Sequence, residues 1–248
     1  AAYSLRRLSS TYTGSAIQVQ RADNVGGTTD IGFDSYGELD TTALTTAAQG
    51  NDMVVAKWYD QSGNSNDAEQ TSSSARPKIY DGTTGVVKGS ISEKPTVFFN
   101  TSHQLPTTAT ASNATLSLFA VAQGNTGRKT VLKLTNANTF DLRTWNTSNY
   151  VLFYGDGSNQ ENIMSSDSSK NETVYAVTKI SGSVNVYLDS NSDKSASTTL
   201  NGTGTIAISE NGQLSGTVNI SEIILYESDQ SSVRTDIEDN INTFYDIY

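Results

Sequence analysis

Apolar positions along the chain recur in short runs, most of which have the length and alternation of strands. Clusters of Gly, Asn, Asp and Ser separate them, and the runs are 53–59, 96–99, 116–122, 130–134, 150–154, 173–180, 183–188, 205–208 and 218–226. Many short strands divided by turn residues indicate a two-sheet sandwich of the jelly-roll type. The Ile180-Ser-Gly-Ser-Val184 junction predicts a tight hairpin between two of these strands.

Helical spacing is found near both ends of the chain. Within 5–12, three apolar residues stand at i, i+3 and i+7 and predict a short first helix: Leu5, Leu8 and Tyr12. A second short helix is expected after a cap at Asp40 or Thr41, with Gly50 ending it. At the other end, Ser228 or Asp229 is expected to cap an amphipathic helix. Its apolar stripe is Val233, Ile237, Ile241 and Phe244.

No linker, repeat or charge block divides the chain. The polar stretches 165–169 and 190–197 are short enough to be loops. We therefore expect one domain, 1–248, with an all-β sandwich fold, short N-terminal helices and a C-terminal helix.

Composition narrows the classes of partner. The 26 acidic and 16 basic side chains give a formal charge of −10, which argues against nucleic acid and anionic membrane surfaces. No stretch approaches 18 consecutive apolar residues, so we expect no membrane insertion and no secretory leader within the sequence. Ser, Thr and Asn make up 86 of the 248 residues, which favours strands and hydrogen-bonded loops.

Several kinds of chemistry are excluded by what the chain lacks. It has no cysteine and one histidine, so thiol nucleophiles, disulfides and His-rich zinc sites are ruled out. His103 has no G-x-S-x-G element to serve and is expected to be a loop residue after a strand. We expect no cofactor and no metal site, with calcium as the open alternative. Asp189-Ser-Asn-Ser-Asp193 alternates oxygen ligands, but Lys194 and Leu200 stand where an EF-hand needs Gly and Glu.

Three segments resemble a known family. AYSLRRLSSTYTGSAIQVQR (2–21) and WYDQSGNSNDAEQ (58–70) resemble the opening of the catalytic domain of α-L-arabinofuranosidase B, a concanavalin A-like sandwich. GTVNISEIILY (216–226) with its helix resembles the ending of laminin-G-like, concanavalin A-like modules. Similar modules occur on bacterial surface proteins and phage tail proteins, where their role is binding.

The second of these segments also makes sense as a turn. Asp60 and Asn64 can hydrogen-bond their own backbone and tolerate left-handed geometry, while Gly63 supplies a positive φ. Such a motif identifies the fold and leaves the chemistry open. Trp58, within an apolar run, is expected in the core.

The resemblance also implies two catalytic positions. In the family, a Glu just after a strand is the nucleophile and an Asp in a Gly-rich loop is the acid/base. Aligning 150–156 and 206–212 with these places puts Asp156 at the nucleophile and Glu210 at the acid/base. Retaining glycosidases need two such carboxyl groups about 5–5.5 Å apart. Each position carries the other residue type, with Asp156 where the family has Glu and Glu210 where it has Asp, and both lie in ordinary turn sequences. The competing interpretation is therefore that both residues only stabilise turns.

Sugar binding needs planar polar groups and an aromatic face. The residues expected to contact a sugar are Trp145, which lies among polar residues, with Tyr154, Asn159 and Asn211. Three functions follow. The first is a lectin-like carbohydrate-recognition domain of a phage tail or secreted surface protein, located outside the cell or on a virion. The second is a retaining glycoside hydrolase of α-L-arabinofuranosidase type, and the third is an inert, homo-oligomeric piece of a fibre.

Overall fold

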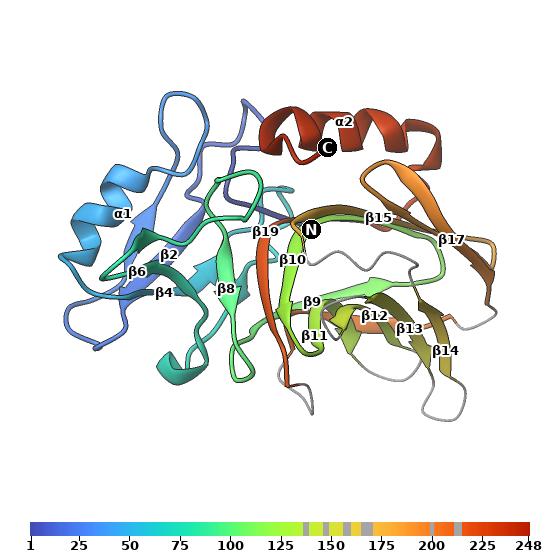
Figure 1. Cartoon of the computed structure of the whole chain (residues 1–248), viewed down its shortest axis with the longest axis horizontal. Helices are drawn as coiled ribbons and strands as arrows, with labels where there is room; N and C mark the ends of the chain where they lie inside the picture. The colour runs from blue at the N-terminus through green and yellow to red at the C-terminus, as the bar shows by residue number, and fades with distance from the viewer. Residues whose placement is uncertain (136–138, 146–148, 156–159, 165–170, 199–200, 211–214) are drawn as a thin grey trace.

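The computed structural model is a β-sandwich with a helix on one outer face (Figure 1). It describes residues 1–135, 139–145, 149–155, 160–164, 171–198, 201–210 and 215–248, with only the backbone described at 139, 145, 149–155, 160–162 and 164. In Figure 1 the six-stranded sheet lies below the part of the larger sheet that contains β15 and β17, and α2 (Arg234–Tyr245) lies above that part. This arrangement confirms the predicted all-β sandwich. Neither helix in the described residues has the length and apolar character needed to cross a membrane.

The larger sheet is continuous from the middle of the sandwich to the N-terminal part of the chain. Its strand order is β17-β16-β15-β10-β19-β8-β6-β4-β2-β3, with β1 added to β19, β5 to β4 and β7 to β6. Its strands are β1 (Ala2–Ser4), β2 (Ile17–Arg21), β3 (Thr29–Ile31), β4 (Met53–Trp58), β5 (Ala68–Glu69), β6 (Lys78–Asp81), β7 (Gly85–Val86), β8 (Val97–Phe99), β10 (Leu116–Thr126), β15 (Thr173–Ile180), β16 (Ser183–Leu188), β17 (Asn191–Ser197) and β19 (Thr217–Tyr226).

The smaller sheet has the order β14-β13-β12-β11-β18-β9 and is antiparallel where its register is described. Its strands are β9 (Leu105–Ser112), β11 (Lys129–Thr135), β12 (Thr139–Trp145), β13 (Asn149–Gly155), β14 (Gln160–Met164) and β18 (Thr203–Ile208). Each of the nine predicted runs coincides with a strand. The structure adds strands that the hydrophobic pattern did not predict, among them β9 and β12.

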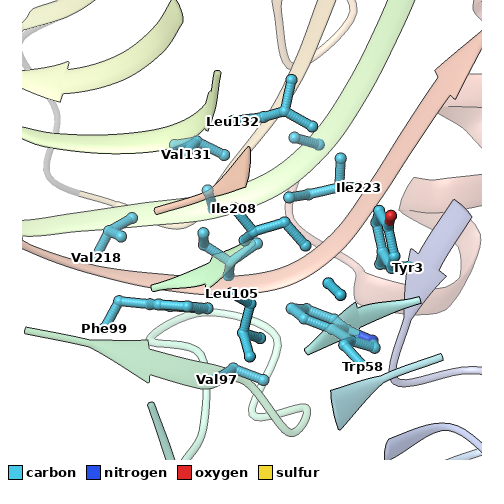
Figure 2. Packing of buried hydrophobic residues seen from close by; sticks show 14 of the residues in the cluster. Tyr3, Trp58, Val97, Phe99, Leu105, Val131, Leu132, Ile208, Val218 and Ile223 are labelled. Atoms are coloured by element: carbon cyan, nitrogen blue, oxygen red, sulfur yellow. The ribbon is translucent and has the colours of Figure 1, made fainter. Parts of the chain in front are cut away.

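The core lies between the two sheets. Figure 2 shows Leu132 and Ile208 of the smaller sheet packed with Ile223 and Phe99 of the larger one. Trp58, predicted to be a core residue, is fully buried and stacks at a tilt against Tyr3. Burying these side chains supplies the main driving force for pairing the sheets.

The second predicted N-terminal helix is confirmed as α1 (Thr41–Ala48). Asp40 caps it by accepting a hydrogen bond from the Ala43 N–H at 2.8 Å, and Gln49 and Gly50 end it with positive φ. Short polar caps and a left-handed stop are the usual boundaries of such a helix. A short 3-10 turn, Ser73–Ala75, follows later in the chain.

The first predicted helix is wrong. Residues 5–12 follow β1 without forming a helix, and the three apolar residues of the supposed stripe go to different places. Leu5 joins the core between the sheets, Leu8 packs beneath α2, and Tyr12 meets Phe33 edge-on. Apolar residues at helical spacing over one or two turns therefore do not share a face here, because the chain sends each of them to a separate cluster.

The C-terminal helix is confirmed, but it begins later than predicted. The predicted cap at Ser228 or Asp229 is wrong: a 3-10 turn, Ser231–Val233, precedes α2, and the helix begins after Val233 without a side-chain cap. Asp229 instead accepts from the Ser231 N–H at the start of that turn. Of the predicted stripe, Ile241 is buried and Ile237 and Phe244 pack in the cluster beneath the helix, whereas Val233 is 39% exposed. In place of Val233, Tyr245 packs in that cluster on the outer face of the larger sheet.

Two turn predictions are confirmed and one loop prediction is corrected. Ser181 and Gly182 both have positive φ and form the two-residue loop of the β15–β16 hairpin. In the 60–67 turn, Gly63 has positive φ, and Asp60 accepts from the N–H groups of Ala2, Ser62 and Asn66. The other left-handed residue of this turn is Ser65 and not Asn64, whose side-chain amide donates to the Ser62 hydroxyl. The stretch 190–197 is largely strand, not loop, because β17 is an edge strand whose polar residues face solvent.

Candidate functional site

The outer face of the smaller sheet carries a group of charged side chains. In β11 and β12, Leu132, Leu134, Phe140 and Leu142 belong to the core cluster. Side chains alternate between the two faces of a strand, so Lys133 and Asp141 face away from the core. These two residues are register partners, and Lys133 also stands opposite Ala207 of β18.

Two ion pairs hold this group together. Lys133 Nζ lies 2.5 Å from Oε2 of Glu210, which follows β18. Arg143, two residues after Asp141 in β12, donates to Asp141 Oδ2 through Nε at 2.5 Å and also through Nη2. We refer to Lys133, Asp141, Arg143 and Glu210 as the charged cluster. Alternating strand positions on three neighbouring strands are what bring these residues together.

Asp141 is the most enclosed member of the charged cluster. Its side chain is 1% exposed, and its Oδ1 has no hydrogen-bond partner among the described residues. Burial raises the pKa of this carboxyl to about 6, although the charges of Arg143 and Lys133 act in the opposite direction. A carboxyl group with such a pKa exchanges its proton in mildly acidic solution. Buried carboxyls of this kind are frequent at functional sites.

Glu210 remains accessible, with its side chain 30% exposed. It directly follows Ser209, which has a φ of +52° in the left-handed region that non-glycine residues rarely adopt. The Ser209 N–H donates to the Val131 carbonyl at 3.2 Å, and its buried hydroxyl has no partner in the described part of the chain. Strained backbone of this kind fixes the direction in which the next side chain leaves the strand.

A further cation lies within electrostatic range of Glu210. Lys129 is completely buried and donates from Nζ to the His103 carbonyl at 3.2 Å. Burial lowers the pKa of this amine to about 8, opposed by the charge of Glu210. His103 itself occupies the turn after β8, as predicted, and its Nδ1 accepts from the Asn100 N–H. Burial lowers the pKa of this imidazole, which therefore stays neutral at pH 7.

The predicted site residues fall into three groups. Glu210 lies in the charged cluster. Trp145 and Tyr154 lie in β12 and β13, where the structure describes their backbone: Trp145 pairs with Asn149 and Tyr154 with Phe140. By alternation, the β12 position of Trp145 belongs with those of Asp141 and Arg143. Asp156, Asn159 and Asn211 lie outside the described residues, so their roles stay predictions.

Lys133, Asp141 and Arg143 were missed in the sequence. The signal was present in 139–145, where Phe140, Leu142 and Thr144 alternate with Asp141 and Arg143. This is the pattern of a strand with one apolar and one charged face. Charged residues within a strand pattern are usually interpreted as solvated, and only the register shows that they meet.

No metal centre is formed by the described residues, since they contain no group of three or more His, Cys, Asp or Glu side chains placed to hold an ion. In the Asp189–Asp193 stretch, Asp189 Oδ1 instead accepts from the Val174 N–H at 2.9 Å. Asp60, in the oxygen-rich 60–67 turn, likewise accepts hydrogen bonds from backbone N–H groups. Burial opposes ionisation of Asp60, but its hydrogen bonds outweigh this effect and lower its pKa.

Comparison with known proteins gives similarity at the level of the fold. No family model and no curated protein sequence match the chain. Among solved structures, it is similar to an arabinofuranosidase complexed with arabinofuranosyl-α-1,2-xylobiose, at 15% identity and a TM-score of 0.76. It is also similar to a glutamate-to-glutamine mutant of a GH54 α-L-arabinofuranosidase soaked with 4-nitrophenyl α-L-arabinofuranoside, at 17% identity and a TM-score of 0.74.

Both alignments cover 99% of this chain and 62% of the other chain. The chain thus spans about three-fifths of the length of these structures. At this level of identity the likeness shows a shared β-sandwich fold.

Proposed function

We propose that the chain is a carbohydrate-recognition domain whose binding site is the charged cluster on the outer face of the smaller sheet. The observation that carries the proposal is the Lys133–Glu210 pair next to the enclosed Asp141–Arg143 pair. Carboxylates and guanidinium groups held by partners present fixed acceptors and donors, which is what sugar hydroxyls require. The shared fold with structures that hold arabinose-containing ligands supports this ligand class.

Recognition is favoured over hydrolysis by the state of the two described carboxyls. A retaining glycosidase needs one carboxylate free to attack and one carboxyl able to donate its proton. Here Glu210 and Asp141 each contact a cationic side chain, so neither carboxylate is free to attack a sugar. The proposal also keeps the predicted contacts of Trp145, Asn159 and Asn211 with the sugar, whereas the position of Tyr154, opposite the core residue Phe140, belongs to the inner face of the sheet.

Hydrolysis is the second candidate, favoured by one observation. Asp141 titrates near pH 6, within the range of a catalytic acid, and lies on the same sheet face as Lys133, the partner of Glu210. In this alternative Asp156 is the nucleophile and Glu210 the acid/base, as the sequence predicts, and Asp141 is a further candidate for the acid.

The setting belongs to the same proposal. A surface rich in Ser, Thr and Asn with a net charge of −10 suits a protein that meets glycans outside the cell, on a secreted protein or a phage tail. Within it, we take residues 1–248 as one domain that contributes the binding site.

The binding test uses a glycan array followed by calorimetry on the strongest glycan. Glu210→Gln and Lys133→Met are expected to weaken binding by about tenfold or more, because each leaves its partner unmatched in the site. The matched control is Glu93→Gln, which breaks the exposed Lys88–Glu93 pair on another surface and should leave affinity unchanged. Equal affinity in wild type and both cluster variants would contradict the proposal.

Hydrolysis is tested by nitrophenol release from aryl glycosides, including the α-L-arabinofuranoside. Recognition without hydrolysis predicts no turnover by a protein that binds glycan. Turnover that is lost in Glu210→Gln would establish the second candidate instead. Circular dichroism spectra of every variant separate loss of the site from loss of the fold.

A further inference from the structure

A cavity of about 750 Å³ lies at the side of the sandwich where the N-terminal and C-terminal segments meet. Its walls come from six parts of the chain: β1 and the residues on either side of it, the 60–67 turn, β9, β18, the end of β19 with the residues that follow it, and α2. A volume in the range of roughly 300–1,000 Å³ is typical of pockets that enclose small ligands.

This cavity is separate from the charged cluster. No member of the charged cluster lines it. The residue of β18 that does line it is Ile206, which belongs to the core between the sheets, whereas the neighbouring Ala207 stands opposite Lys133 on the outer face. The two sites therefore have no residue in common.

The lining is amphipathic. Ile206, Leu225 and Ile237 supply apolar surface, while amides and hydroxyls come from Asn64, Asn66, Asn240 and Thr110. Sugar rings combine an apolar C–H face with hydroxyls at the edge, and sites that bind them need both kinds of surface.

The polar side is held in place before any ligand arrives. Asp60 accepts from the Asn66 N–H at 3.0 Å, and the Tyr3 hydroxyl donates to the Asn66 carbonyl at 2.5 Å. On α2, the Asn240 Oδ1 accepts from Arg6 Nη1 at 2.9 Å, which orients its amide nitrogen. Preorganised donors and acceptors lower the entropic cost of binding.

Charge selects against an acidic ligand. Arg6, which also lines the cavity, is committed to Glu222 through hydrogen bonds from Nε and Nη2 at 2.8 and 2.9 Å. The Ala1 amino group donates to the Leu225 carbonyl, and its pKa is lowered by burial, against the charges of Asp60 and Glu227. Glu227 and Asp236 then contribute negative charge to the lining.

We infer that this cavity is a second binding site, for a short neutral saccharide of one or two rings. The inference stands apart from the proposed function, because the cavity is lined by a different set of residues.

The test is titration of the isotope-labelled chain with cellobiose, maltose and lactose at millimolar concentrations, followed by amide NMR shifts. At least one sugar is expected to shift resonances of 61–66 and 236–241, and glucuronic acid is expected to shift them less. Thr110→Trp should abolish the shifts by filling the cavity from an exposed strand position, and Asn64→Ala should reduce them. Thr108→Trp, equally exposed in β9 but outside the lining, is the matched control.

The inference is overturned if none of the three sugars shifts these resonances in the folded protein. It is also overturned if the shifts persist in both Thr110→Trp and Asn64→Ala, or if glucuronic acid binds equally well. Glu210→Gln should leave this site intact, so failure here and failure at the charged cluster are distinguishable.

Discussion

At the scale of single residues, Asp141 shows how a sheet surface can enclose an ionisable group. It points away from the core, yet its side chain is 1% exposed, and one of its carboxylate oxygens accepts hydrogen bonds from Arg143. The pairing offsets only part of the cost of removing a carboxylate from water, so the folded protein holds the proton more tightly than the unfolded chain does.

This difference predicts a dependence of stability on pH. The pKa of Asp141 is about 6 in the folded state against 3.8 unfolded, so its contribution is favourable below pH 3.8 and is lost as pH rises through 6. The Asp141→Asn variant has no carboxyl group at this position and does not lose this stabilisation as the pH rises. Between acidic pH and pH 7, its free energy of unfolding should therefore rise by about 3 kcal/mol relative to that of the wild type. Urea denaturation at several pH values checks this, and a pH-independent difference would contradict the assigned shift.

At the scale of elements, the β15–β16 hairpin shows local sequence and backbone geometry in agreement. Its loop residues Ser181 and Gly182 have φ of +48° and +85°, the combination that a two-residue loop with the twist of the flanking strands requires. A Cβ at Gly182 would stand 2.9 Å from the Thr198 carbonyl oxygen.

Two neighbouring substitutions are therefore expected to differ. Gly182→Ala should destabilise the protein by about 1–2 kcal/mol, through its left-handed backbone and the contact with Thr198. Ser181→Gly, in the same loop, relieves a left-handed serine and should leave the melting temperature unchanged or slightly higher. Thermal denaturation compares the pair, and equal melting temperatures for both variants would refute the argument.

At the scale of the whole molecule, one buried network joins the two ends of the chain. Glu222 of β19 is fully buried and accepts from Arg6 Nε, Arg6 Nη2 and the Ser4 hydroxyl at 2.7–2.9 Å. Tyr245 of α2 adds its hydroxyl at 3.3 Å. Strand β1, strand β19 and the C-terminal helix thus meet at a single carboxylate.

Breaking this network on one side should be costly. Arg6→Met leaves a buried carboxylate without its cation and is expected to destabilise the fold by about 3–5 kcal/mol. The double variant Arg6→Met with Glu222→Leu should lose less than the sum of the single variants, because no charge remains unpaired. Urea denaturation of the cycle measures this coupling. Arg21→Met, which breaks the exposed pair with Asp23, is the control with little expected effect, and additive losses in the cycle would exclude the coupling.

The strands, one hairpin, α1 and the C-terminal helix could be predicted because each is specified by its own residues. Apolar runs, Asp40 as a cap and Ser181-Gly182 as a turn act over a few positions. The prediction was wrong in 5–12, where Leu5 and Leu8 reach separate clusters, and at 190–197, where an edge strand needs no apolar face.

Of the candidate site, Glu210 came from the resemblance, while Lys133, Asp141 and Arg143 came only from the register of β11, β12 and β18. The sequence by itself determined the all-β class, the absence of thiol chemistry and the positions of most strands, because composition and periodicity are local properties. Tertiary structure alone decided which charged side chains meet, which are buried and where a cavity remains. The pairing of strands brings residues that are distant in the chain to within a few ångströms of each other, and burial shifts the pKa values of their ionisable groups.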